Sequence, residues 1–407
     1  MRKKADIVRK TWRSLLELYY YTEKTILSDQ VKLERAIRVF SMLPIQRNKV
    51  VMDSYNGKGY GDNPKYIAEE IHRIDKNRCK IIWLTNDTKT KYPPYITPVY
   101  KQSLRAYYEF VTAKALVYNS RVGRLAKKRA GQIFLQTWHG GIATKKVEMD
   151  AEAKLSEWYI SNAKEDGLIS DGIVVDGKPN EELFLRAFWL NKNCEFLKYG
   201  SPRVDVLINE KDNAEIRGRV RKSLGIENDD FFVLYAPTFR KDSTVENYIS
   251  SFNEILKVFE AGFGKTKIAY RLHPNAESLM DLVEWGSSCS INATKYPDVQ
   301  ELVIAADCLI TDYSSIAYDF AVLRKPVFLC VKDIEEYMED RGVYDIFYDQ
   351  PFRLNRTENE LIEEIQNSSM DEIVKRIDLF YEKYPSYNKG TASEQTVKWL
   401  MNKGLQV

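Results

Sequence analysis

Two histidines are the strongest candidates for proton-transfer chemistry in this chain. Only three of its 407 residues are histidine. Two of them, His139 and His273, follow short apolar runs that predict buried strands, and they lie in opposite halves of the sequence. A neutral imidazole can take a proton from a hydroxyl group near pH 7. The third, His72, lies in a predicted helix and is interpreted as a surface or packing residue. The two strand-end histidines therefore predict a catalytic site between two halves of the protein.

Polar and small residues follow the other predicted strands in the same way. In open parallel sheets, ligands bind outside the carboxyl ends of the strands, so these positions are the first candidates for binding. They are Trp138, His139 and Gly140 after IFLQT, Ser201, Pro202 and Arg203 after FLKYG, Pro237, Thr238 and Arg240 after FFVLYA, Arg271, His273 and Pro274 after KIAY, and Thr311, Asp312, Ser314 and Ser315 after CLI.

The segment TDYSS has the composition of an anion site. Ser314 and Ser315 stand where a predicted strand gives way to a predicted helix. Their hydroxyl groups and the free N–H groups of a helix start could bind a phosphate. Ordinary capping of a helix by Ser and Asp would leave the same sequence pattern, so both interpretations stay open here.

Known metal and nucleotide motifs are absent from the sequence. It contains no Asp-x-Asp, no HExxH and no cluster of Cys and His with ligand spacing. The glycine-rich run GKGYGDNP lacks the Lys-Ser/Thr of a P-loop, and GxGxxG and GxSxG are also missing. We therefore expect no metal and no cofactor. Helix dipoles, His and Arg would then have to neutralise any bound diphosphate.

The elements that must position these residues alternate between strand and helix. Short β-branched runs at 49–55, 80–86, 115–120 and 133–140 are each followed by a helical pattern, and the alternation restarts at Phe231. This predicts an α/β protein with two Rossmann-like halves and a helical tail. A charged stretch at 210–222 is a plausible junction. The predicted boundaries are 1–45, 46–210, 211–388 and 389–407, and a helix is also expected over 276–286.

The first 45 residues predict an amphipathic helical segment with a basic start. Its apolar residues recur at spacings of three and four, and six Lys and Arg residues crowd positions 2–13. A solvated helix packed on the domain and a helix lying on an anionic membrane both fit this pattern.

Composition excludes several classes of protein. The chain is 44% hydrophobic and 29% charged, which excludes a wholly disordered protein, and its net charge of +3 is small for a nucleic-acid binder. No stretch reaches the ~20 apolar residues that span a bilayer, and the N-terminus has no signal-peptide core. The five cysteines are scattered without a CxxC motif, as in a reducing compartment. We therefore expect a soluble cytosolic protein.

Six motifs in order resemble one enzyme family. These motifs are SYNGKGYGDNPKYIAEEI, LQTWHGG, YGSPRVDVL, LYAPTFR, RLHP and LITDYSSIAYDFAVLRKP. They resemble those of the CDP-glycerol glycerophosphotransferases of wall teichoic acid synthesis, which include primases and polymerases. The resemblance runs from about Val50 to the helices before Lys389.

This resemblance implies a GT-B fold, with two Rossmann-like domains facing across a cleft: 46–210 would bind the acceptor and 211–388 the donor. It implies transfer of glycerol phosphate from CDP-glycerol to a hydroxyl of an undecaprenyl-diphosphate-linked acceptor, with release of CMP, at the cytoplasmic face of the membrane. His139 would be the base, with His273 in the second catalytic position, although the two roles could be exchanged. Candidate donor-side residues are Thr238, Arg240, Arg271, Thr311, Asp312, Ser314 and Ser315, and candidate acceptor-side residues are Trp138, Gly140, Gly141 and Arg203.

Two departures from the family pattern affect substrate identity. The Thr-Pro turn that commonly follows WHG is Gly141-Ile142 here, and Pro351-Phe352 stands in place of a Pro-Gly. A CDP-ribitol-dependent transferase or polymerase, a GT-B sugar transferase and an idle binding protein of the same fold stay open as alternatives. Since only about 45 residues precede the match, we expect addition of one or a few units rather than long chains.

Overall fold

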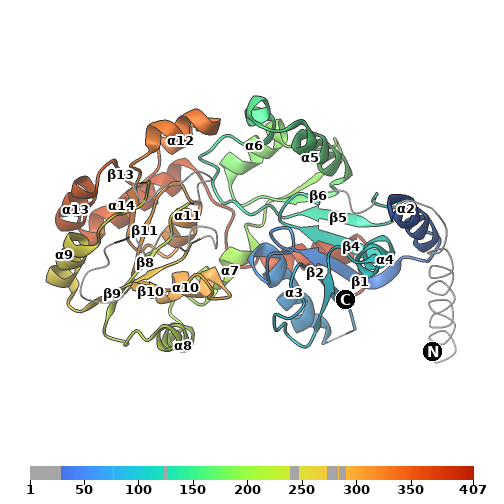
Figure 1. Ribbon diagram of the computed structural model, residues 1–407, viewed down its shortest axis with the longest axis horizontal. Helices are drawn as coiled ribbons and strands as arrows, with labels where there is room; N and C mark the ends of the chain where they lie inside the picture. Colours follow the sequence, from blue (N-terminus) through green and yellow to red (C-terminus); the bar gives the residue numbers. More distant parts are fainter. Residues whose placement is uncertain (1–28, 77, 123–126, 239–246, 273–282, 284–289) are drawn as a thin grey trace.

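The computed structural model describes residues 29–76, 78–122, 127–238, 247–272, 283 and 290–407 (Figure 1). Within these residues the strands form two parallel sheets, one of seven strands and one of six. The two sheets lie beside each other along the long axis of the molecule, each with helices on its faces (Figure 1). The expected architecture, an α/β protein of GT-B type built from two Rossmann-like domains with helices at both ends, is confirmed.

The first sheet has the strand order of a Rossmann fold. Its order is β3-β2-β1-β4-β5-β6-β7, so the connections reverse direction between β1 and β4. The strands are β1 (Gln46–Asp53), β2 (Lys80–Thr85), β3 (Ile96–Tyr100), β4 (Ala113–Tyr118), β5 (Ile133–Gln136), β6 (Gly172–Val174) and β7 (Glu195–Leu197). The helical elements of this half are α2 (Asp29–Phe40), α3 (Asp62–Asp75), α4 (Leu104–Thr112), η1 (Glu148–Lys154), α5 (Glu157–Ile169) and α6 (Lys178–Ala187).

Alternating side chains of this sheet enter two different cores. Val50 and Met52 pack with residues of α3 on one face, whereas Val51 packs with Phe110 of α4 on the other. Both faces are therefore apolar, as expected for a parallel sheet covered by helices on both sides. Local signals set the helix starts: the hydroxyl of Ser103, for example, accepts the N–H of Ala106 and so caps α4.

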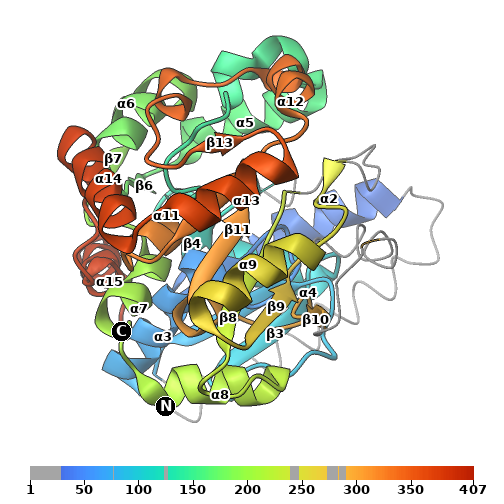
Figure 2. The same cartoon turned by 90° about the vertical axis from the view of Figure 1, so that its left-hand side faces the viewer.

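The second sheet repeats the same topology. Its order is β10-β9-β8-β11-β12-β13, with the reversal between β8 and β11 (Figure 2). The strands are β8 (Phe231–Tyr235), β9 (Thr266–Tyr270), β10 (Ser290–Asn292), β11 (Cys308–Thr311), β12 (Val327–Cys330) and β13 (Leu354–Asn355). The helical elements of this half are α8 (Ala214–Leu224), α9 (Asn253–Phe263), α10 (Val299–Ala305), α11 (Ile316–Ala321), α12 (Ile334–Arg341), η4 (Asp345–Phe347), α13 (Glu358–Asn367) and α14 (Met370–Lys383). Between the two halves, α7 (Pro202–Asn209) packs on both α3 and α10.

The C-terminal helix returns to the first domain. After α14 the chain crosses back, and α15 (Ala392–Asn402) packs against α3 and α7. Val397 and Leu400 are fully buried in the same core as Val50. The carboxylate of Asp205 accepts the first N–H groups of this helix, which attaches it to α7.

Some expectations concern residues that lie outside the described part of the chain. These are the N-terminal amphipathic helix over 1–28 and the helix over 276–286. The middle stretch, which shows no regular pattern in the sequence, forms β6, α6 and β7. Most of the charged stretch at 210–222 lies in α8, whose Arg221 is fully buried. Among the described residues, no helix is both long and apolar enough to span a membrane. The four domain boundaries stay predictions.

Candidate active site between the two domains

His139 lies in a loop that follows the carboxyl end of β5, here called the histidine loop (residues 137–142). Its ring is half-buried, and Nδ1 lies 2.6 Å from the backbone carbonyl oxygen of Asn119 at the end of β4. A carbonyl oxygen can only accept a hydrogen bond, so Nδ1 carries the proton and donates it. In the neutral ring, Nε2 then keeps its lone pair and can act as a base.

The surroundings of His139 favour the neutral imidazole. Burial lowers its pKa below the ordinary value, against the opposing effects of the Asn119 carbonyl and the Asp62 carboxylate. The guanidinium groups of Arg203 and Arg121 lower the pKa further. Near neutral pH the ring is therefore unprotonated at Nε2, as a general base must be.

Trp138 fixes the shape of the histidine loop. It adopts a positive φ of 52°, which is uncommon for a residue other than glycine and stores local strain. Its N–H is bonded to the side-chain oxygen of Gln136, and its carbonyl accepts the side-chain amide of Asn63. The Trp138 ring lies 4.5 Å from the His139 ring, centroid to centroid. The Trp138 ring thus packs beside the ring of the proposed base.

The two glycines after His139 lie in different surroundings. Gly140 is partly exposed, whereas Gly141 is buried. The carbonyl of Gly141 accepts the side-chain amide of Asn180, and a Cβ atom at this position would lie 3.4 Å from Oδ2 of Asp176. This is an ordinary contact distance. A side chain at position 141 would therefore point into the junction between the domains.

Arg203, a candidate acceptor-side residue, is buried between the two domains. Its Nη1 lies 2.6 Å from the carbonyl oxygen of His139 and 3.1 Å from Oδ2 of Asp62, both in the first domain. Its Nε and Nη2 lie 2.9 and 3.1 Å from the two carboxylate oxygens of Asp319, on α11 of the second domain. The arginine therefore joins the two halves.

The loop after β1 completes the first half of the site, and motif reasoning did not single out its residues. The hydroxyl of Tyr55 donates to Oδ2 of Asp62 at 2.6 Å, and the Tyr55 ring meets the His139 ring edge-on at 5.7 Å. At the end of β4, the buried guanidinium of Arg121 lies over the Trp138 ring and 2.7 Å from Glu148. The sequence did contain a signal, because Tyr55 and Asp62 flank the glycine-rich run after a predicted strand. In the structure both residues adopt a positive φ.

On the donor side, Asp312 joins the ends of β8 and β11. Its buried carboxylate accepts both the N–H of Thr238, at 2.9 Å, and the Thr238 hydroxyl, at 2.6 Å. The hydroxyl of Thr311 donates to the carbonyl of Ala236. The side chains of Asp312 and Thr311 therefore hold the loop after β8 against the end of β11.

Ser314, Ser315 and Arg271 are partly exposed donor-side candidates, as is Thr238. Both serines are partly exposed and directly precede α11, and the Ser315 side chain makes no capping hydrogen bond. Nη1 of Arg271 is bonded to the carbonyls of Ala293 and Tyr296. Burial lowers the pKa of Arg271, and Asp298 and Tyr55 oppose this effect. Arg240 and His273 lie outside the described residues.

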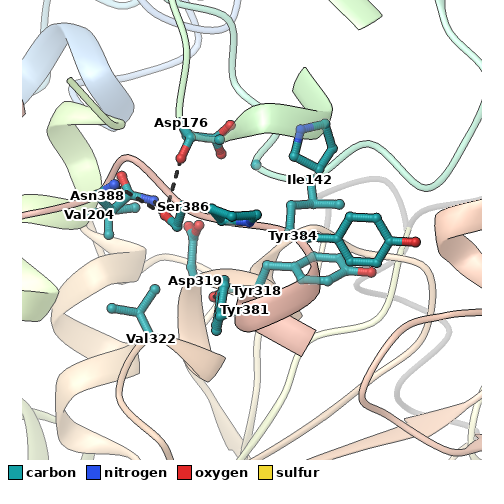
Figure 3. Close-up of a pocket in the computed structure, with 14 residues that line it drawn as sticks. Ile142, Asp176, Val204, Tyr318, Asp319, Val322, Tyr381, Tyr384, Ser386 and Asn388 are labelled. Carbon is teal, nitrogen blue, oxygen red and sulfur yellow. Dashed lines mark hydrogen bonds between the residues drawn. The ribbon is translucent and has the colours of Figure 1, made fainter. Parts of the chain in front are cut away.

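A small cavity lies where the two domains meet, lined by Gly141 and Asp176 of the first domain and Tyr318 and Asp319 of the second (Figure 3). Its volume is about 20 Å³, enough for about one water molecule and far too small for a nucleotide. Burial raises the pKa of Asp176, which lines it, to about 6; Arg203 and Asn180 oppose the shift and Asp319 adds to it. The Asp176 carbonyl accepts the hydroxyl of Ser386, from the segment that leads to α15 (Figure 3). The cavity belongs to the domain contact rather than to a substrate site.

Within the described residues, no group of three or more His, Cys, Asp or Glu side chains could hold a metal ion. Metal independence of the reaction stays a prediction.

Comparisons with known proteins agree on one family. The family described as CDP-Glycerol:Poly(glycerophosphate) glycerophosphotransferase matches residues 35–402. A teichoic acid poly(glycerol phosphate) polymerase of Bacillus subtilis is 31% identical over 374 residues, which cover 88% of this chain and 49% of the relative. The chain thus spans about half the length of that relative and of a second such polymerase, from Staphylococcus epidermidis.

Other relatives are similar over their full length. A teichoic acid glycerol-phosphate transferase of Staphylococcus aureus is 26% identical over 409 residues, covering 96% of this chain and 98% of the relative. The solved structure of the wall teichoic acid polymerase TagF shares the fold, with a TM-score of 0.81, 24% identity and 98% coverage of both chains. With a family match over residues 35–402 and the strand orders described above, the chain belongs to the CDP-Glycerol:Poly(glycerophosphate) glycerophosphotransferase family.

Proposed function

We propose that this protein transfers glycerol phosphate from CDP-glycerol to a hydroxyl group of an undecaprenyl-diphosphate-linked acceptor in teichoic acid synthesis. The acceptor oxygen attacks the β-phosphorus of CDP-glycerol. The bond from this phosphorus to the bridging oxygen breaks, and CMP leaves with that oxygen. The acceptor proton passes to Nε2 of His139.

One observation carries the assignment of the base. The Asn119 carbonyl accepts a hydrogen bond from the protonated Nδ1 of His139, and burial keeps the ring neutral, so Nε2 is left as an acceptor. Phosphoryl transfer needs positioning and neutralisation of charge more than covalent help from the protein. A well-oriented neutral histidine meets the first of these needs.

The donor would lie against the second domain. Nucleotides bind at the point where the strand order of a Rossmann fold reverses, which here lies between β8 and β11. Arg271 and the hydroxyl groups of Ser314 and Ser315 are placed around this point and would bind the diphosphate. His273 and Arg240 complete this proposal from the sequence. TagF structures described with CDPG support a CDP-alditol as the donor.

The closest competing donor is CDP-ribitol. Relatives of this chain include ribitol-phosphate polymerases of Staphylococcus aureus, at 23% and 22% identity. The relatives also include polymerases and a glycerol-phosphate transferase, so the number of units added is a second open property.

Nucleotide release by the purified protein tests the proposal. The protein is incubated with a lipid-linked acceptor and, in turn, with CDP-glycerol, CDP-ribitol and a UDP-sugar, and the released nucleotide is quantified. We expect acceptor-dependent CMP release with CDP-glycerol, and loss of that release in His139→Ala. Faster CMP release from CDP-ribitol would reassign the donor, and UDP release alone would overturn the proposed function.

A further inference from the structure

Arg203 is a buried side chain that contacts both proposed halves of the site. Its side chain is only 3% exposed. Four hydrogen bonds leave its guanidinium group: two reach Asp319 on the donor side, and two reach Asp62 and the His139 carbonyl on the acceptor side.

The partners of Arg203 are themselves held in place. Asp319 also accepts the side-chain amide of Gln300, at 3.0 Å, and Asp62 accepts the Tyr55 hydroxyl. Burial lowers the pKa of Arg203, but the carboxylates of Asp319 and Asp62 outweigh this effect and hold it well above its ordinary range. The guanidinium therefore stays charged, in a network whose members cannot easily rotate away.

Each end of this network is attached to a group with a proposed chemical role. On one side the contact is the carbonyl of His139, the same residue whose ring is the proposed base. On the other side Asp319 lies on α11, four residues and about one helical turn after Ser315. Other contacts also join the two halves, such as the Tyr66 hydroxyl with Asp298 at 2.8 Å, but Arg203 contacts the histidine loop itself and the helix that follows the proposed phosphate-binding serines.

We propose that Arg203 is a positioning residue that holds the base loop at the correct distance from the donor phosphates. This inference rests on the proposed function. Lysine cannot replace arginine here, because an ammonium group is a point donor and cannot span a carboxylate in two-point contact while also bonding two oxygens on the other side. A misplacement of about 1 Å can cost ~10²-fold in rate, so Arg203→Lys should lower kcat by about 10- to 100-fold. Donor binding should change little, because the donor-side residues lie within the second domain.

Arg221→Lys is the matched control. Arg221 is also fully buried, but its hydrogen bonds reach Ala305, Asp230 and Asp307, all in the second domain. We expect both variants to melt at lower temperatures than the wild type. Well below those temperatures, only Arg203→Lys should lose kcat, with the Kd for CDP-glycerol from calorimetry within about threefold of wild type. Equal losses of kcat in the two variants would overturn the proposal.

A double-mutant cycle tests the connection between the domains. Asp319→Asn should lower kcat on its own, and adding it to Arg203→Lys should cost little more, since either change breaks the same link. Additive losses would show that the two residues act separately and would overturn the proposal.

Hydrogen exchange supplies a readout that needs no activity. Amides of the histidine loop (residues 137–142) should exchange faster in Arg203→Lys than in wild type, and at the wild-type rate in Arg221→Lys. Unchanged exchange in Arg203→Lys would overturn the positioning role. If the wild type instead releases no CMP from CDP-glycerol, the proposed function fails, while this measurement still decides whether Arg203 orders the loop.

Discussion

Replacing His139 by alanine tests the proposed mechanism most directly. The change removes Nε2, the proposed proton acceptor, and the hydrogen bond from Nδ1 to the Asn119 carbonyl. Loss of a general base typically costs 10²- to 10⁴-fold in rate, or about 3–5 kcal/mol in the barrier. We expect kcat to fall by this amount. The Kd for CDP-glycerol should be near wild type, since the donor residues lie in the other domain.

The pH profile gives the same prediction a second, independent form. Burial lowers the pKa of His139 below its ordinary value of 6.5. The wild-type kcat/KM should therefore rise with pH through a pKa below 6.5 and then level off, because the base must be unprotonated in the free enzyme. In His139→Ala the residual rate should lack this rise. A control variant, His72→Ala, removes an imidazole that stacks on Tyr95, outside the proposed site, and should keep both the rate and the profile.

Steady-state CMP release between about pH 5 and pH 9 is the assay, with calorimetry for donor binding. A wild-type rate in His139→Ala would refute the assignment of the base. An acid limb that survives in the variant would assign that limb to another group. Loss of donor binding together with rate would mean that the ring contacts the donor rather than the acceptor hydroxyl.

Three further predictions concern stability, metal ions and the membrane. The folded-state pKa of Asp176, about 6, exceeds the ordinary 3.8, so the wild type loses stability as pH rises through 6. Asp176→Asn lacks this loss, so its stability relative to wild type should increase by about 2 kcal/mol from pH 4 to pH 8. A pH-independent difference between the two proteins in thermal denaturation would contradict this. Activity should survive exhaustive EDTA treatment, because the sequence has no Asp-x-Asp; complete loss restored by Mg²⁺ or Mn²⁺ would show that a metal ion neutralises the diphosphate. Deleting residues 1–14 should reduce flotation with anionic liposomes, as should raised salt, since each Lys or Arg near such a surface contributes about 1 kcal/mol; unchanged flotation would place the membrane contact elsewhere.

The fold could be predicted because its signals are local. β-branched runs separated by helical patterns specify parallel strands with crossovers, and the carboxyl ends of those strands identify the residues around the site. His139, Ser314 and Ser315 became candidates in this way, and their roles stay predictions. The three-residue strand β6 was missed, because so short a run shows no periodicity that a loop would lack, whereas β7 overlaps the predicted strand FLKYG.

The contacts across the domains could not be predicted. Arg203 follows a strand and begins a helix, so its position indicates a binding residue. What decides its surroundings is the approach of Asp319, 116 residues later in the chain. No spacing rule relates two such positions, because their distance depends on how two separately folded sheets pack. The return of α15 to the first domain was missed for the same reason.

The two domains share one hydrogen-bonding arrangement at equivalent points of their sheets. In each sheet the strand order reverses at one point, and ligands generally bind at such points in open parallel sheets. A polar side chain from the later strand holds the loop after the earlier strand. In the first domain, Oδ1 of Asn119, after β4, accepts the N–H of Tyr55 at 2.7 Å. In the second, Asp312, after β11, accepts the N–H of Thr238 at 2.9 Å.

These bonds fix the loops before any substrate arrives. In the first domain the same residue, Asn119, also holds the His139 ring through its carbonyl, so loop shape and base orientation depend on one residue. Each domain is thus ordered internally by short hydrogen bonds. What neither domain can set alone is the spacing between them. That spacing is the quantity on which an in-line transfer depends, and we propose that Arg203 sets it at the histidine loop.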